Sequence, residues 1–249
     1  MNAILEPRII FTDDQLLILD KPAGWLTHPS GRSETPSVTE WLLDHYPSLA
    51  TVGPPEQLQD GTMISRAGIL HRLDRETSGV IAAAKTKEAF NWFTKAFRER
   101  KVDKVYRAIV SGVVKLDDGV IDLPVGRSRK DPRRRVASKR AHGELRSAVT
   151  HFRVLERFVQ HTYLELKPET GRTHQLRVHL KAIHAPILGD ELYASPRLAG
   201  LGLALPTINR MALHAFSLTL PWPNGEKKYF ESPLPEDLQK TLDSLRESC

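Results

Sequence analysis

Short apolar runs separated by polar turns alternate along this chain with segments of helical periodicity. Residues 9–11 and 16–19 are apolar on either side of a turn-forming Thr-Asp-Asp trio. Apolar side chains alternate through 102–114, which predicts a longer strand. Residues 148–155 and 162–166 are typical of an antiparallel pair. The pattern therefore predicts two strand pairs and one longer strand.

Four segments carry the signals of helices. The segment 37–46 opens with Ser-Val-Thr-Glu, which fits a capping box, and 86–100 opens with a threonine that can cap it. A third helix is predicted at 173–181, with Thr173 as its cap, and a fourth from about residue 235. The apolar residues that these helices are expected to bury are Ala89, Phe93, Ala96, Phe97, Leu176, Leu180, Ile183, Leu238, Leu242 and Leu245.

The stretch 68–79 places one carboxylate between two arginines. A short apolar run leads to Asp74, which lies between Arg72 and Arg75, and a Thr-Ser-Gly sequence then turns the chain into a second apolar run. A strand, a polar crest and a strand present a reactive side chain on a rigid base. Neighbouring cations favour the ionised carboxylate, which suits nucleophilic attack or proton abstraction. A solvated ion pair on a loop explains the same pattern equally well.

Proline and glycine predict three loops. Residues 20–29 contain Pro22 and Gly24, which force an irregular backbone of the kind that often carries function, although a plain turn after a strand has the same signals. Residues 47–67 contain three prolines and two glycines, and 194–209 are rich in glycine, alanine, leucine and proline. Both segments are therefore expected to be long loops.

A basic segment lies at 127–140. Eight of its fourteen residues are cationic and no helical spacing of apolar residues is present. The cations are Arg127, Arg129, Lys130, Arg133, Arg134, Arg135, Lys139 and Arg140. The Asp131-Pro132 pair breaks the run, so a flexible basic arm or a hairpin is predicted. A solvated loop is the plainer alternative, but so many cations without matching acids favour contact with an RNA backbone.

Composition narrows the classes of protein. The net charge of +6 favours polyanionic partners, and no apolar run approaches the length of a membrane span. The single cysteine, Cys249, excludes an intrachain disulfide framework and a cysteine-rich metal site, and it fits a reducing compartment. His174, His179 and His184 do not share one helical face, so we expect no metal site. Phosphate-binding glycine motifs are also missing, so we expect no nucleotide cofactor.

Several ordered segments between about residues 9 and 235 resemble the motifs of the RluA family of pseudouridine synthases. The most specific is the His-Arg-Leu-Asp-Arg-x-Thr-Ser-Gly sequence at 71–79. The other segments are 21–29, 104–112, 171–180, 184–193 and 213–215. The segment 184–193 departs from the family pattern, because an additional Ala185 separates the histidine from the proline.

The resemblance implies a fold and an activity. The fold would be α+β, with a mixed, mostly antiparallel central sheet flanked by helices and a cleft across its middle. Residues 1–249 would form a single catalytic domain, without a separate N-terminal RNA-binding domain. The activity would be isomerisation of chosen uridines in a transfer or ribosomal RNA stem-loop, with the base flipped out and no cofactor. A cytoplasmic monomer without membrane contact is expected.

The resemblance also implies roles for particular residues. Asp74 would be the essential aspartate, Arg177 would pair with it and hold it ionised, and Tyr106 would pack against the uracil and take its proton. Arg72 would fill the place of the flipped base, and Leu213 would line the uracil pocket. The other residues expected to bind the substrate are His71, Thr77, Lys21, Arg133, Arg134 and Arg135, with the loop 20–29 at the rim or wall of the site.

The sequence alone leaves open the chemical role of Asp74 and two alternative functions. Asp74 could attack the sugar carbon or ring carbon 6, or it could remove a sugar proton. A catalytically silent RNA-binding protein or RNA chaperone could keep the same fold. A carboxylate-dependent hydrolase is a further rival, but it should show a second carboxylate in a matching motif, and none stands out.

Overall fold

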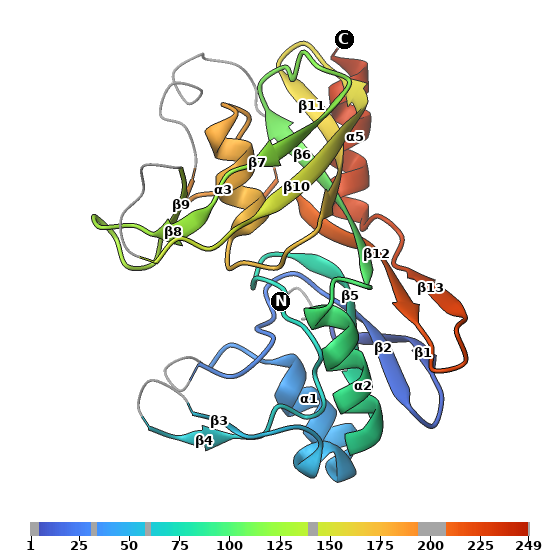
Figure 1. Ribbon diagram of the computed structural model, residues 1–249. Coiled ribbons are helices and arrows are strands. Elements are labelled where there is room, and N and C mark those ends of the chain that lie inside the picture. Colours follow the sequence, from blue (N-terminus) through green and yellow to red (C-terminus); the bar gives the residue numbers. More distant parts are fainter. Residues whose placement is uncertain (1–4, 31–33, 58–60, 139–143, 194–207, 249) are drawn as a thin grey trace. The chain divides into compact units, whose positions relative to one another are not determined.

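The computed structural model describes residues 5–30, 34–57, 61–138, 144–193 and 208–248 of the chain (Figure 1). The chain divides into two compact units. The first comprises Met1–Asp103 and Ala215–Pro233, and the second comprises Lys104–His214 and Leu234–Cys249. Each unit combines β-strands with helices, as expected for an α+β protein. Within the described ranges, no helix is both long enough and apolar enough to cross a membrane.

The first unit is built on strands β1, β2, β5 and β12, in that order, with β13 beside β12. The bounds of these strands are Arg8–Thr12 for β1, Leu16–Lys21 for β2, Ser78–Ala84 for β5, Leu213–Pro221 for β12 and Lys227–Glu231 for β13. The first two form the predicted hairpin, and β2 pairs antiparallel with β5. Strand β5 is buried along its whole length, as expected for its apolar run at 80–84.

The two α-helices of the first unit begin where the sequence predicts. Helix α1 (Val38–His45) has the predicted capping box, because the Glu40 amide donates to the Ser37 hydroxyl at 3.2 Å and the Ser37 amide donates to the Glu40 carboxylate at 3.0 Å. Helix α2 (Lys87–Arg98) is capped by Thr86. Its buried residues include all of those predicted except Phe97, which is half-buried.

Two predictions for the first unit need correction. The segment 47–67 is not simply a loop, because its described part contains a 3₁₀ turn, η1 (Pro47–Thr51), and two short paired strands, β3 (Glu56–Gln57) and β4 (Met63–Ile64). The apolar run before Asp74 is not a full strand. It meets β5 only through an isolated bridge of Ile69 to Ala83 and the adjoining backbone bonds, because the chain bends away too soon.

The second unit contains the strands β6, β11, β10 and β7, in that order, and all neighbours pair antiparallel. Their bounds are Asp103–Ser111 for β6, Asp118–Asp122 for β7, Val149–Arg157 for β10 and His161–Pro168 for β11. Helices α3 (Gln175–Ala182) and α5 (Glu236–Glu247) contribute their leucines to the core of this unit. The predicted antiparallel pair and both helices are thus confirmed.

The start of α3 differs from the prediction. Thr173 is not the cap; the residue before the helix is His174, which has a left-handed backbone with φ of 57° and makes no side-chain cap bond. The basic segment also takes one of its two predicted forms. Strands β8 (Val125–Arg127) and β9 (Arg135–Ala137) pair antiparallel and make it a hairpin. Lys139, Arg140 and most of the predicted loop at 194–209 lie outside the described residues.

Close packing of β5 predicts that Gly79→Ala is strongly destabilising. Gly79 has φ of +112°, and a Cβ there would lie 2.2 Å from the Ala215 carbonyl oxygen. Backbone strain and overpacking should together lower the free energy of unfolding by about 3 kcal/mol or more. The matched control is Gly225→Ala, where φ is +88° but nothing lies within 4 Å, so only about 1 kcal/mol is expected. Urea unfolding measures both, and equal losses would contradict the packing argument.

Candidate active site

Asp74 lies on a turn in the first unit. The Thr77 amide donates to the Asp74 carbonyl at 3.0 Å, so Asp74 takes the first position of a β-turn, where aspartate is favoured. The turn leads directly into the buried strand β5, and the Asp74 side chain is half-buried. Arg75, one of the two flanking cations, forms an ion pair with Glu76 at 2.8 Å. The geometry can therefore present one carboxylate from a rigid base.

Lys21 and Gly24 join this turn to the first loop. The Gly24 amide donates to the Arg75 carbonyl at 2.9 Å. The Lys21 ammonium group donates to three carbonyls, those of Pro22, Trp25 and Arg75, at 2.8 to 3.0 Å. Lys21 is fully buried. It therefore supports the loop from within and presents no charge at the surface, which argues against the direct substrate contact predicted for it.

The other three residues of the first unit that were predicted to bind substrate, His71, Arg72 and Thr77, differ in how far they are exposed to solvent. His71 accepts a hydrogen bond from the Ala82 amide at 3.2 Å, and its ring stacks on Phe97 at 5.1 Å between centroids. Thr77 is buried, whereas Arg72 is exposed. Of these three predicted substrate-binding residues, Arg72 therefore has the side chain best placed to meet a large partner, and the others hold the turn in place.

His28 is a titratable group for which the sequence suggested no role. The Thr39 hydroxyl donates to the Thr27 carbonyl at 3.0 Å, so it accepts from His28 Nδ1 at 2.8 Å and Nδ1 carries the proton. Burial, and then the positive charges of Arg66 and Arg72, lower the pKa of His28 to about 4. His28 is therefore neutral near pH 7 and fixes the loop to α1.

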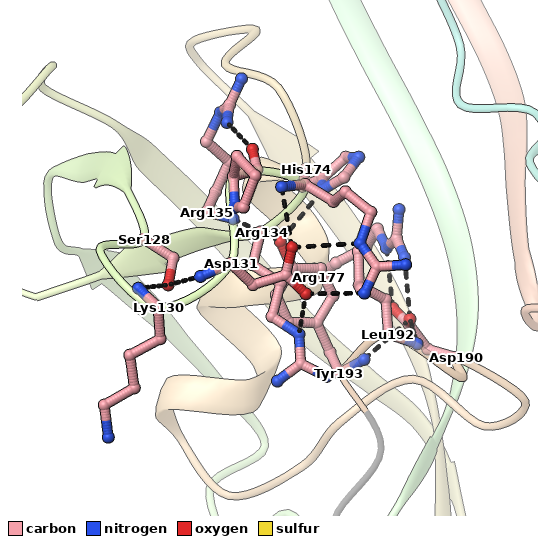
Figure 2. A network of polar contacts seen from close by, with 12 residues as sticks. Ser128, Lys130, Asp131, Arg134, Arg135, His174, Arg177, Asp190, Leu192 and Tyr193 are labelled. Atoms are coloured by element: carbon pink, nitrogen blue, oxygen red, sulfur yellow. Dashed lines mark hydrogen bonds and ion pairs between the residues drawn. The ribbon is translucent and has the colours of Figure 1, made fainter.

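Arg177 is held rigidly in the second unit. Its Nε and Nη2 donate to the two oxygens of Asp190 at 2.8 Å each, and its guanidinium lies 4.9 Å from the centre of the Tyr193 ring (Figure 2). Asp190 is buried and also accepts from the amides of Leu192 and Tyr193. The predicted pairing of Arg177 with Asp74 joins residues of different units and stays a prediction.

Tyr193 links this ion pair to the basic hairpin. The Tyr193 hydroxyl accepts from the Arg135 amide on β9 at 2.7 Å and lies 2.9 Å from His174 Nδ1 (Figure 2). Tyr193 is buried although it bears a hydroxyl group, and these bonds satisfy that group. Sequence reasoning predicted no role for Asp190 or Tyr193. The only signal was their place in a family motif, where Asp190 directly follows Gly189 and Tyr193 comes three residues after Asp190.

The hairpin is less purely cationic than the sequence suggested. Asp131 interrupts the basic run, and in the structure it accepts two bonds from the Arg133 guanidinium at 2.9 and 3.1 Å and lies 3.5 Å from Arg134 Nε. The bond from the Arg133 side chain is the main reason that the pKa of Asp131 falls to about 2. The cations therefore have one matching acid. Those with exposed side chains on the hairpin are Arg127, Arg129, Lys130 and Arg133.

Tyr106 and Leu213 lie in one hydrophobic cluster of the second unit. Leu213 is buried within it, and Tyr106, on β6, is half-buried and packs against it. Both placements agree with ordinary core packing and with a pocket wall. Among the described residues, no group of three or more His, Cys, Asp or Glu side chains could hold a metal ion.

Known proteins are similar to nearly the whole of this chain. A family model for RNA pseudouridylate synthases matches residues 15–182. The ribosomal large subunit pseudouridine synthase D of Neisseria meningitidis serogroup A is 38% identical over 243 residues, which cover 96% of this chain and 61% of that protein. The protein of the same name from Pseudomonas aeruginosa is 40% identical over 250 residues, covering 98% and 73%.

A solved structure is also similar. The protein described as human RNA pseudouridylate synthase domain containing 4 is 29% identical, with a TM-score of 0.71, and the match covers 96% of this chain and 93% of that one. The chain spans about three-fifths of the length of the Neisseria relative. Similarity therefore extends over nearly all of this chain and over about three-fifths of that longer relative.

The lowered pKa of His28 predicts that acid weakens the fold. The unfolded chain binds a proton at His28 below its ordinary pKa of 6.5, whereas the folded protein binds it only near pH 4. The stabilisation is thus fully present above pH 6.5 and is lost as the pH falls from there towards 4. His28→Asn, which can still donate to Thr39, should remove up to about 2 kcal/mol of the loss between about pH 7 and pH 5. Urea unfolding at both pH values tests this, and parallel losses in variant and wild type would refute it.

Proposed function

The chain belongs to the RNA pseudouridylate synthase family, and we propose that it isomerises chosen uridines in RNA to pseudouridine. Membership confirms the family resemblance and the α+β fold class predicted from the sequence. The observation that carries the proposed activity is Asp74, the aspartate of the central motif, on a hydrogen-bonded turn at the start of a buried strand.

The isomerisation requires one reactive carboxylate and a uracil ring that is kept in place while its bond to the sugar is exchanged. The bond between the sugar and ring nitrogen 1 breaks and a bond from the sugar to ring carbon 5 forms. Carbon 5 loses its proton and ring nitrogen 1 gains one, so the atoms of the uridine are conserved. No water is consumed, so the second carboxylate of an ordinary glycosidase is not required. In this proposal Asp74 attacks the sugar carbon or ring carbon 6, or removes a sugar proton. Tyr106 stacks on the uracil and takes the proton released from carbon 5.

Arg177 would keep Asp74 ionised. Its bonds to Asp190 use Nε and one hydrogen of Nη2, and a guanidinium has a second edge, formed by Nη1 and Nη2, that suits another carboxylate. A guanidinium fixed by Asp190 loses little conformational freedom when it binds that second carboxylate. This small loss of conformational entropy supports the predicted pairing of Arg177 with Asp74.

RNA binding would fall to Arg72 and the hairpin. The exposed Arg72 lies two residues before Asp74, so it is suited to fill the space left by a flipped base. The hairpin carries exposed cations on a chain of net charge +6, which supports phosphate contact. Arg133, Arg134 and Arg135 would act there, while Leu213 would line the uracil pocket. Lys21, His71 and Thr77 would act from behind the site by fixing its backbone.

The substrate we favour is ribosomal RNA. The Neisseria and Pseudomonas relatives are named for the large ribosomal subunit, and both are at least 38% identical to this chain. We therefore propose a uridine of large-subunit ribosomal RNA, presented in a stem-loop, in preference to transfer RNA. A monomer in the cytoplasm stays part of the proposal.

Loss of the Asp74 carboxylate should abolish turnover without abolishing binding. Asp74→Asn removes the reactive carboxylate but not the shape of the turn, so pseudouridine formation should fall below detection while RNA affinity stays within about three-fold. Pseudouridine mapping of large-subunit ribosomal RNA and transfer RNA after incubation measures the first quantity. Glu76→Gln, a carboxylate two residues away that pairs with Arg75, is the control and should stay active.

Two outcomes would count against this assignment. Full activity of Asp74→Asn would remove Asp74 from the chemistry. Wild-type protein that binds RNA tightly but modifies neither RNA class would favour the silent RNA-binding protein instead.

The hairpin can be tested separately through salt dependence. Changing Arg133, Arg134 and Arg135 to Ala should weaken binding to all RNA sequences and lower the slope of log K against log salt by about 0.7 for each phosphate of single-stranded RNA that the variant no longer neutralises. A triple variant of Lys95, Lys227 and Lys240, exposed cations outside the hairpin, removes the same charge and should keep the wild-type slope. An unchanged slope in the hairpin variant would mean that these arginines do not bind RNA.

A further inference from the structure

Thr27 satisfies the backbone of the residue that precedes Asp74. Its hydroxyl donates to the Leu73 carbonyl at 2.9 Å and accepts from the Leu73 amide at 3.1 Å. One side chain thus meets both polar groups of a single residue. Thr27 is 4% exposed and Leu73 is 5% exposed, so water does not replace these bonds.

Leu73 has no regular secondary structure to supply those partners. It lies after the isolated bridge of Ile69 and before β5, so no strand ladder reaches it. A buried amide or carbonyl without a partner is costly, and the chain relaxes toward any geometry that satisfies it. The position of Leu73, and therefore of the next Cα, depends on the Thr27 hydroxyl.

Thr27 is itself fixed to α1. Its carbonyl accepts from the Thr39 hydroxyl at 3.0 Å and from the Thr39 amide at 3.2 Å. The preceding residue, Leu26, makes a parallel bridge to Ser37, the cap of α1. The turn is thereby joined, through Thr27, to a helix whose own start is closed by a capping box.

From this geometry we infer that Thr27 is a positioning residue for Asp74. It holds the backbone before the aspartate, while Gly24 and Lys21 hold the Arg75 carbonyl after it. The inference rests on the proposed role of Asp74 in the reaction. An error of about 1 Å in the position of a reacting group can lower the rate roughly 100-fold. Hydrogen bonds that fix the backbone on both sides of Asp74 should therefore increase the rate of the reaction.

Thr27→Val keeps the shape of the side chain and replaces the hydroxyl with a methyl group, which can neither donate nor accept a hydrogen bond. We expect the single-turnover rate constant at saturating RNA to fall by roughly 10- to 100-fold, with RNA affinity within about two-fold of wild type. Thr27→Ser, which retains the hydroxyl, should keep at least about half of the rate. A loss in RNA affinity alone, at unchanged saturating rate, would overturn the inference.

Thr162→Val is the matched control. The buried Thr162 hydroxyl makes the same kind of pair in the second unit, donating to the Gly112 carbonyl at 2.9 Å and accepting from the Val114 amide at 3.0 Å. It should be destabilised as Thr27→Val is, but keep its rate constant. Equal losses of rate in the two variants would show a general effect of instability and would overturn the inference.

Amide hydrogen exchange in the absence of RNA separates the structural step from the chemical one. Thr27→Val should lose protection at the Leu73 amide, and Thr162→Val at the Val114 amide, each without affecting the other. Unchanged protection at Leu73 would overturn the inference. Wild-type protein with a protected Leu73 amide but no activity on RNA would instead overturn the proposed function, and the catalytic role of Thr27 with it.

A milder variant covers failure of Thr27→Val to fold. Thr39→Val leaves the Thr27 hydroxyl in place but removes one of the two bonds to the Thr27 carbonyl, together with the bond that the Thr39 hydroxyl accepts from His28. It should lower the saturating rate by about two- to five-fold, a smaller effect of the same kind. A wild-type rate in that variant would count against the inference.

Discussion

Hydrogen bonds from the segment 21–27 to the backbone on both sides of Asp74 are the interaction on which the candidate site depends. Thr27 meets Leu73, and Gly24 and Lys21 meet the Arg75 carbonyl. The turn is closed by the bond from the Thr77 amide to the Asp74 carbonyl, and the loop bonds fix the backbone on either side of it. The loop is itself joined to α1, because the Thr27 carbonyl accepts from the Thr39 hydroxyl and amide.

The second unit fixes a positive charge by similar means. Asp190 holds Arg177 through two charged hydrogen bonds, and the Tyr193 ring lies against the same guanidinium. The Tyr193 hydroxyl also accepts from the amide of Arg135, the first residue of β9 in the basic hairpin. The hairpin proposed to bind RNA and the groups that order the arginine are therefore parts of one hydrogen-bonded network, in which Asp190 and Tyr193 are buried and Arg177 and Arg135 are half-buried.

Features with strong local causes could be predicted from the sequence. The capping box of Ser37 and Glu40 and the cap at Thr86 are set by residues three apart, so neighbouring residues are enough to identify them. The cap predicted at Thr173 was wrong, because His174 adopts a left-handed backbone and takes the place before the helix. Charge counting along 127–140 also misled, since Asp131 bends back to bind the arginines that follow it.

The sequence alone determined the family resemblance, the helices, most of the strands and the identity of the candidate aspartate, because each of these is written in residues close together in the chain. Only the tertiary structure decided that Lys21 is buried among carbonyls and that Thr27 holds the backbone before Asp74. The bond of Lys21 to the Arg75 carbonyl joins residues 54 positions apart, and the bond of Thr27 to Leu73 joins residues 46 apart. Residues so distant in the chain become hydrogen-bond partners only when the whole unit folds and buries their polar groups side by side. No local sequence pattern therefore identifies these pairs.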